Sequence, residues 1–474
     1  MQRHTRGDRQ THREFTVVSS VRFSLDLSLT LAMGLMCECR YEEQLEKFCK
    51  LMDFVIDSPP PELRQLYHAS MVDRMKDKVD KSVFWSKLLG IVMQQGQKDM
   101  PFANNTVCKV NSFYTGRNFF DLLLSPASKG DVLKATLATD AVIGTMAGVN
   151  TPGSGYVLLH HIMGETGGQR GVWAYVEGGM GSVSSAISKA ALEAGVQIVT
   201  NAEVSQVMVD ETTGKVQGVA LADGTELHSS VVLSNATPYK TFVDLVPANT
   251  LPEEFLCAIK TADYSSATTK INVAVDALPQ FRCCKNINRK GGPEHMGTIH
   301  IGSESMEEID IAYKEAAGGF SSTRPVIEMT IPSVLDKTIS PPGQHVINLF
   351  VQYTPYKLSE GSWQDPAVRK SFAERCFSLI DEYAPHFSSS VIGYDMLTPP
   401  DLEREFGLTG GNIFHGAMGL DSLFLMRPAK GWSDYRTPVK GLYLCGSGAH
   451  PGGGVMGAPG RNAAAVVLDD LKAR

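Results

Sequence analysis

Between residues 173 and 236 the apolar pattern predicts one helix followed by a run of strands. Apolar residues from Val183 to Ala194 recur at helical spacing on one face, and Gly195 is a natural stop for that helix. Apolar runs then predict four strands, at 196–200, 204–210, 215–222 and 231–233. Turn signals at Gly214 and Asp223-Gly224 favour an antiparallel meander. This order of elements is typical of the middle of a nucleotide-binding domain.

A different apolar pattern runs from residue 237 to 396. Four segments alternate or run continuously apolar and predict an antiparallel sheet covered on one side: 270–276, 297–302, 326–331 and 346–353. Residues 366–383 predict a helix. Residues 397–440 are rich in glycine and predict loops, after which the chain returns to the first domain as a C-terminal segment, 441–474. The first domain is therefore expected to be built from the separated segments 173–236 and 441–474.

Upstream of residue 173 the pattern is helical over 41–172 and is interrupted by prolines such as Pro59 to Pro61. Residues 1–40 predict a poorly ordered tail. The first 24 residues are rich in Arg, Ser and Thr, as in a mitochondrial presequence, although Asp8 and Glu14 count against that interpretation. A disordered or alternative start is the competing interpretation.

The composition is that of an ordinary globular protein. The 474 residues are 43% apolar and 20% charged, and the net charge of −7 includes no basic block of the kind that binds nucleic acid. None of the nine cysteines shows the spacing of a zinc site or of a redox-active dithiol, so we expect free thiols and no metal. No apolar run reaches the length of about 18 residues that a membrane-spanning helix needs.

The C-terminal segment carries the clearest chemical signal. A short apolar strand leads into a turn with almost no side chains, and an alanine-rich helix with Pro459 near its start follows. Glycines let a flat ligand lie against backbone N–H groups, and the start of a helix adds unpaired N–H groups and the positive end of the helix dipole. This combination suits a flavin, because the reduced flavin ring holds negative charge near one edge.

Gly452, Gly454 and Gly457 formally match the dinucleotide-binding fingerprint, which alone is a weak signal. No acidic ribose ligand about 20 residues on and no βαβ unit follow them. We therefore interpret the turn as backbone support beneath an isoalloxazine ring rather than as an ADP-binding turn.

The C-terminal segment and the 173–236 block together resemble the phytoene desaturase-like branch of the amine-oxidase-type flavoproteins. The resemblance covers roughly residues 41–474 and includes Thr151-Pro-Gly-Ser-Gly-Tyr-Val-Leu-Leu-His-His, Lys270-Ile-Asn-Val-Ala-Val-Asp and Leu397-Thr-Pro-Pro-Asp-Leu-Glu-Arg. It implies an α/β fold: an FAD/NAD(P)-binding Rossmann-like domain, incomplete at its N-terminus, with a second α+β substrate domain built on an antiparallel sheet.

The resemblance also implies where FAD would lie. Its flavin end is expected on the C-terminal turn, with Met456 near the ring, and its adenine against the backbone of Val204. The expected contacts on the turn come from Gly446, Gly452, Gly453, Gly454, Val455, Met456 and Gly457. His415 and His450 are expected near the flavin and the substrate, where a histidine could transfer protons, although packing within a loop is the more ordinary role. No catalytic acid or base is identified.

We therefore expect an FAD-dependent oxidoreductase that transfers a hydride from an unidentified, possibly apolar, substrate to flavin. By resemblance its location is the mitochondrial matrix, with the cytoplasm as the alternative. A second interpretation is a catalytically impaired, truncated flavoprotein that acts as a mitochondrial binding or regulatory protein. A third, an NAD-dependent dehydrogenase, leaves the C-terminal glycines unexplained.

One departure from the family pattern concerns the N-terminal region. Residues 1–40 contain no glycine-rich turn between a strand and a helix, the element that binds the FAD pyrophosphate in this family. We expect from this a truncated or alternative product that binds FAD weakly and has low stability. Strands at 231–233 and 442–445 would then expose apolar edges.

Overall fold

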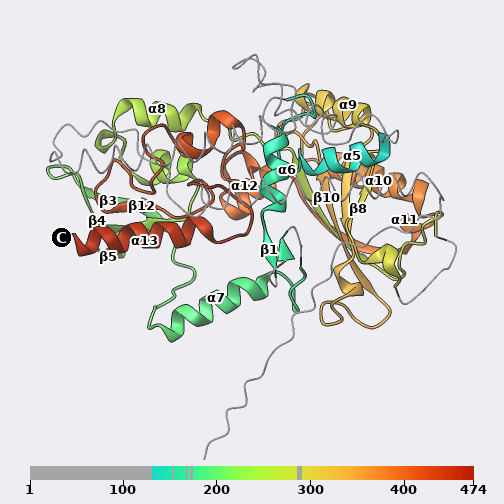
Figure 1. Ribbon diagram of the computed structural model, residues 1–474, viewed down its shortest axis with the longest axis horizontal. Coiled ribbons are helices and arrows are strands. Elements are labelled where there is room, and N and C mark those ends of the chain that lie inside the picture. Colours follow the sequence, from blue (N-terminus) through green and yellow to red (C-terminus); the bar gives the residue numbers. More distant parts are fainter. Residues whose placement is uncertain (1–130, 152–153, 167–168, 171–173, 285–290, 474) are drawn as a thin grey trace, which may run out of the picture.

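The protein folds into two lobes that lie side by side (Figure 1). The computed structural model describes residues 131–151, 154–166, 169–170, 174–284 and 291–473, so the expectations for 1–40 and for most of 41–172 lie outside the described residues. One lobe contains a five-stranded antiparallel sheet, and the other contains a three-stranded antiparallel sheet and a two-stranded parallel sheet. The expected α/β fold with a separate antiparallel sheet is confirmed.

The larger sheet has the strand order β11-β7-β10-β9-β8. Its strands are β7 (Thr268–Val275), β8 (Ile299–Ile301), β9 (Val326–Thr330), β10 (His345–Gln352) and β11 (Val391–Leu397). Leu349 on the central strand lies opposite Ile271 and Met329, and all three side chains are fully buried. The four predicted strands are confirmed. The sequence did not predict β11, because most side chains of this edge strand are exposed and form no apolar run.

Helices cover this sheet and extend its core. The predicted helix α10 (Pro366–Tyr383) begins after Asp365, whose carboxylate accepts a hydrogen bond of 2.8 Å from the Ala367 N–H. Its residues Phe372, Cys376 and Ile380, spaced four apart, pack against the sheet. A second core joins α5 (Asp131–Asp140) and α9 (Met306–Ala317) to the end of β10, and the short helix α11 (Phe387–Ser390) follows α10.

The other lobe contains the predicted meander. Its strands are β3 (Val204–Asp210), β4 (Lys215–Leu221) and β5 (Glu226–His228), and the expected turns at Gly214 and Asp223-Gly224 connect them. The parallel pair consists of β6 (Val232–Ser234) and β12 (Leu442–Leu444). The C-terminal helix α13 (Ala458–Lys472) packs Ala463, Val466 and Val467 into the core of this lobe.

Residues 240–261 pack with this second lobe and not with the larger sheet. They form a π-helical turn (Lys240–Leu245) and α8 (Glu253–Thr261). Phe242 and Phe255 meet edge to face at 4.8 Å in the same core as Val207. The expected boundary at 237 assigned these residues to the substrate domain. The structure differs because apolar periodicity predicts a buried helical face but not the sheet that the face will cover.

The predicted helix after residue 180 forms as α7 (Gly181–Glu193), but none of its residues is buried. The predicted strand at 196–200 does not form, and Val199 is 74% exposed. A strand requires a neighbouring strand to pair its N–H and C=O groups, and none of the described strands pairs with these residues. The strand β12 pairs with β6 on one side and forms a single bridge from Tyr443 to Arg436 on the other, so the edge predicted to be open at 442–445 is partly covered, and its three side chains are buried.

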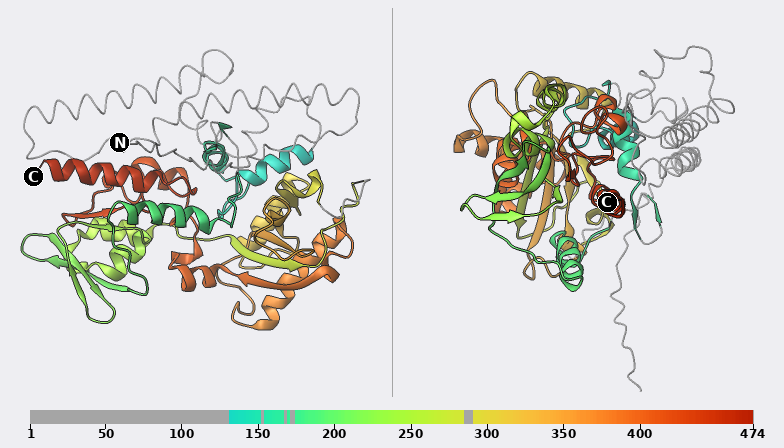
Figure 2. Two further views of the ribbon diagram at one scale, coloured as in Figure 1. Left: turned by 90° about the horizontal axis from the view of Figure 1, so that it is seen from below. Right: turned by 90° about the vertical axis from the view of Figure 1, so that its left-hand side faces the viewer.

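Shorter elements occupy the region between the lobes. They are α6 (Ser154–Ile162), the two-residue strands β1 (Glu165–Thr166) and β2 (Gln169–Arg170), and α12 (Pro399–Phe406). Figure 2 shows the lobes from two further directions, with the start of α13 pointing toward the larger sheet's lobe. Within the described residues, no helix combines the length and the apolar character that crossing a membrane requires.

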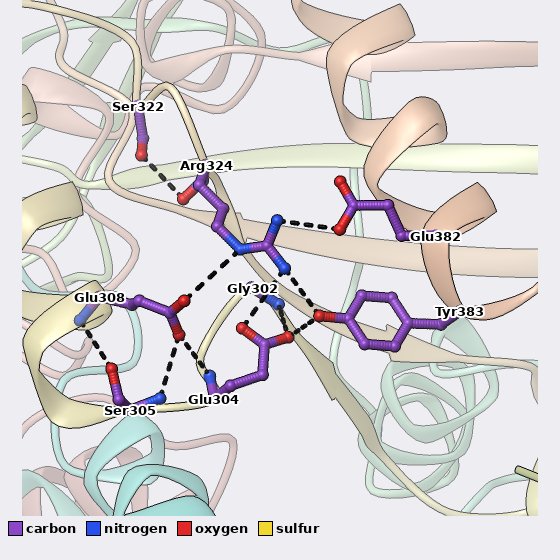
Figure 3. A network of polar contacts seen from close by, with 8 residues as sticks. All are labelled: Gly302, Glu304, Ser305, Glu308, Ser322, Arg324, Glu382 and Tyr383. Atoms are coloured by element: carbon purple, nitrogen blue, oxygen red, sulfur yellow. Dashed lines mark hydrogen bonds and ion pairs between the residues drawn. The ribbon is translucent and has the colours of Figure 1, made fainter.

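A cluster of charged side chains joins α9, α10 and the loop before β9 (Figure 3). The Arg324 guanidinium lies 3.0 Å from a carboxylate oxygen of Glu382, 3.5 Å from Glu304 and 3.9 Å from Glu308. It also donates a hydrogen bond of 2.7 Å to the Tyr383 hydroxyl, which in turn donates to Glu304. One cation therefore holds three carboxylates from different segments together.

We expect Arg324→Met to lower the unfolding free energy by about 1–2 kcal/mol, because three neighbouring carboxylates lose their shared cation while remaining partly buried. Urea denaturation of the full chain measures the change. Lys370→Met is the matched control, because Lys370 and Glu374 form an i,i+4 pair on α10 in which both side chains are exposed, and its loss should cost less than about 0.5 kcal/mol. Equal effects of the two substitutions would contradict the role assigned to Arg324.

Candidate functional site

The glycine-rich turn of residues 446–457 joins β12 to α13, and its first half packs tightly against the residues that follow β6. A Cβ atom on Gly446 would lie 2.5 Å from the Asn235 side-chain oxygen, and one on Gly448 would lie 2.4 Å from the Pro238 ring. Both distances are too short for a side chain. These two glycines are therefore required by contacts within the protein itself.

Protein side chains also cover the middle of the turn. A Cβ atom on Gly452 would lie 2.9 Å from the Met418 sulfur, and one on Gly453 would lie 2.9 Å from the Phe414 ring. Both glycines are buried. The sequence analysis expected an open backbone surface at Gly452 and Gly453, and the structure differs there because the 414–418 loop folds over them.

The last part of the turn is open. Gly454, Val455, Met456 and Gly457 are exposed, with Val455 at 83%, and no atom lies within 4 Å of a Cβ built on Gly457. Among the described residues, the N–H groups of 453–457 donate no hydrogen bond. They precede the N-terminus of the 15-residue helix α13. Unpaired N–H groups beside a helix N-terminus fit the anionic edge of a flat cofactor such as flavin.

His160 on α6 fixes the backbone at the boundary between the covered and the open parts. Its Nε2–H donates to the Gly453 carbonyl, and its ring lies 5.9 Å from the Tyr156 ring. The side chain is 3% exposed, and its Nδ1 has no partner among the described residues. The sequence analysis did not single out His160. A signal was available, because His160 and His161 lie at the end of an apolar helix where polar side chains are rare.

Arg427 is buried beneath the glycine-rich turn. It connects this turn to the covering loop, residues 414–418. Its guanidinium donates hydrogen bonds to the carbonyls of Phe414, Gly416, Ala417, Ser422 and Ser447. No carboxylate among the described residues pairs with it. Burial lowers the pKa of Arg427 to about 10, so it remains charged at neutral pH. The sequence analysis missed this residue, because an isolated Arg in a glycine-rich loop has no distinctive spacing.

The structure brings the expected histidines close to the same region. His450 is fully buried, with its ring 6.3 Å from Phe424. His415 is half-buried, has a left-handed backbone (φ 61°), and its Nδ1 has no partner among the described residues. Both therefore lie in the packed layer beneath the turn rather than on its open part.

Val204 lies apart from this group, at the start of β3, where it pairs with Leu221 of β4. None of the hydrogen bonds or strand pairings described for Val204 reaches the turn. Cys445 is a free thiol before the turn, and burial raises its pKa, which favours the unreactive protonated form. Of the predicted contacts on the turn, residues 454–457 are exposed, whereas Gly446, Gly452 and Gly453 are buried; Val204, predicted at the adenine end, lies apart from them.

Comparison of whole sequences finds proteins that are similar to this chain. No protein-family model matches the chain. It is 45% identical over 443 residues to the rat (Rattus norvegicus) pyridine nucleotide-disulfide oxidoreductase domain-containing protein 2, covering 91% of this chain and 72% of the relative. It is 23% identical over 353 residues to the chloroplastic prolycopene isomerase of Daucus carota, covering 74% of this chain and 52% of the isomerase.

Among solved structures, an oxidoreductase from Methanosarcina mazei matches with a TM-score of 0.49 and 18% identity, covering 85% of this chain and 73% of that chain. The 45% identity to the rat protein extends over most of both sequences. The chain therefore belongs to the family of pyridine nucleotide-disulfide oxidoreductase domain-containing protein 2.

Proposed function

We propose that this protein is an oxidoreductase that holds FAD on the open part of its C-terminal glycine turn. The observation that carries the proposal is the run of N–H groups at 454–457, which belong to exposed residues, have no acceptor among the described residues and lie just before α13. The name of the rat relative and the resemblance to amine-oxidase-type flavoproteins point to the same class of reaction.

The residues of the turn have separable roles in this proposal. The N–H groups of Gly454 to Gly457 and the dipole of α13 would stabilise negative charge on the cofactor. Val455 and Met456 would border it, and His160 fixes the Gly453 carbonyl directly before these N–H groups. Bound flavin supplies the capacity to accept a hydride from the substrate, which no side chain of the site can supply.

His160 and His415 have lowered pKa values and are not charged at neutral pH. Burial, opposed by the hydrogen bond to Gly453, lowers the pKa of His160 to about 4. Burial and the charge of Arg427 lower the pKa of His415 to about 4 as well. Both are neutral at pH 7, so their contribution there is hydrogen bonding and packing. The protein's main contribution to the reaction is then orientation and electrostatic stabilisation.

A second candidate function is a binding or regulatory role without redox chemistry. It is favoured by the side chains of Met418 and Phe414, which cover Gly452 and Gly453 where a cofactor ring was expected. The absorbance spectrum of the purified full chain distinguishes the two candidates. Flavin bands after incubation with FAD support the oxidoreductase, and their absence together with capture of a protein partner supports the binding role.

We also propose a mitochondrial, matrix location, with the cytoplasm as the alternative. The proposal rests on the family resemblance and on the Arg-rich composition of the first 24 residues. Apolar substrates are proposed only by the likeness to the desaturase-like branch, and the substrate itself is not identified.

We expect Gly460→Glu to weaken FAD binding at least tenfold, because it places a negative charge in the first turn of α13, beside the proposed anionic edge. A Cβ on Gly460 meets only the Cys445 carbonyl, at 3.8 Å, so a side chain fits. Fluorescence titration with FAD measures the affinity. An acidic residue in the first turn favours helix stability, so unfolding would not explain the loss.

Gly460→Gln is the matched neutral control for this experiment and should bind FAD nearly as the unchanged chain does. Melting temperatures of both variants should equal or exceed that of the unchanged chain. If Glu and Gln at this position give the same FAD affinity, flavin does not lie at the start of α13.

The neutral buried histidines predict a pH dependence of stability. The pKa of His160 is about 4 in the folded protein and about 6.5 in an unfolded chain, so the unfolded state binds more protons between these values. The unfolding free energy should therefore fall as pH decreases from 6.5 to 4, by about 3 kcal/mol from His160 alone. His160→Gln should reduce this slope without abolishing it, because His415 titrates in the same range.

Urea denaturation at several pH values measures the slope. The control is His228→Gln, since the His228 side chain is 71% exposed and should not change it. A slope in the His160→Gln variant as steep as in the unchanged chain would show that His160 is not held neutral by burial.

A further inference from the structure

Three side chains of metal-ligating type converge on the face of the larger sheet that α5 meets. The Nε2 atom of His300 lies 3.2 Å from Oε1 of Glu328 and 3.8 Å from Oδ1 of Asp140. All three atoms lie within 4.8 Å of one another, and among the described residues this is the one such group of three. The members are separated by up to 188 positions in the sequence, so no local motif predicts them.

Rigid elements hold these side chains together. His300 on β8 and Glu328 on β9 are directly opposite in the strand register, and Glu328 also lies opposite Phe350 of the central strand. Asp140 is the last residue of α5, a helix that packs in the same core as α9. Because strand register and helix packing set all three positions, the ligand atoms are arranged before any ion arrives.

The members of this group interact with one another: the His300 Nε2–H donates a hydrogen bond to Glu328, and Asp140 lies 3.8 Å from the same nitrogen. The side chains of Glu328, His300 and Asp140 are 15%, 12% and 35% exposed, and no Lys or Arg among the described residues forms an ion pair with either carboxylate. Lys270 is in the same row across the sheet but is separated from Glu328 by Phe350 of the strand between. The buried Nδ1 of His300 has no partner among the described residues. Two carboxyl groups and one imidazole therefore converge on one place, with no Lys or Arg of the described residues in an ion pair with them, and could share a metal ion.

We propose that Asp140, His300 and Glu328 bind one divalent transition-metal ion, with Zn²⁺ and Mn²⁺ as the ions that this donor set suits. One imidazole nitrogen and two carboxylate oxygens are typical ligands of such ions. Ligands at about 2.1 Å from a shared ion lie roughly 3–4 Å apart, which matches the two separations from His300. The exposed part of Asp140 leaves room for water or a substrate oxygen to complete the coordination. The site does not depend on the proposed flavin.

The test is direct metal binding to the full chain without FAD. The chain is stripped with a chelator, dialysed, and titrated calorimetrically with Zn²⁺ and separately with Mn²⁺. We expect one equivalent of bound ion and a higher melting temperature with metal. Asp140→Asn and His300→Gln should each weaken binding at least tenfold, because each removes one of three ligands.

His228→Gln is the matched control, since His228 lies 3.4 Å from Glu226 on the surface without a third ligand. It should leave the affinity unchanged. Absence of saturable binding by the unchanged chain, or equal affinity in Asp140→Asn and in the control, overturns the proposal. If His300→Gln fails to fold, Asp140→Asn decides the question, because its side chain is the most exposed of the three and keeps its shape.

Discussion

The candidate site depends on one buried charge, the guanidinium of Arg427. A cation without a carboxylate partner is costly to bury unless every donor finds an acceptor, and here backbone carbonyls supply all of them. Phe414 and Ala417 contribute from the covering loop, and Ser447 contributes from the glycine turn. These carbonyls cannot rotate away without leaving buried N–H groups unpaired. Arg427 therefore fixes how the loop lies on the turn, and so decides which of the glycines are covered and which are open.

Both lobes contribute to the open part of the turn. β12 and α13 belong to the core that contains Leu444 and Val467, whereas His160 approaches from α6, between the lobes. The N–H groups at 454–457 lie between the peptide that His160 holds and a helix that is packed along one face. A perturbation in either lobe would therefore change the proposed cofactor contacts.

Two clusters of charged side chains on the lobe with the larger sheet contain similar acidic residues. They differ in whether a Lys or Arg pairs with the carboxylates. Around Arg324, three glutamates share a cation, so the cluster joins helices and needs no further partner. Around His300, Asp140 and Glu328 converge without a Lys or Arg. The Arg324 cluster stabilises the packing of α9 and α10. The Asp140–His300–Glu328 group is the one proposed to bind a metal ion. Lys270 lies beyond Phe350 in the same row across the sheet, where it interacts electrostatically with Glu328 but forms no ion pair with it.

The sequence by itself determined the elements whose signals are local. Alternating apolar residues predicted β7 to β10, glycine turns predicted the meander, and the side-chain-poor segment predicted the turn before α13. Prediction from the sequence failed where contact with a residue far away in the chain decides the local structure. Residues 196–200 have a strand pattern but no neighbouring strand in the described residues, and Gly452 is covered by Met418 from another loop. Only the tertiary structure could place Arg427, His160 and the Asp140–His300–Glu328 group, because their roles come from contacts between residues far apart in the chain.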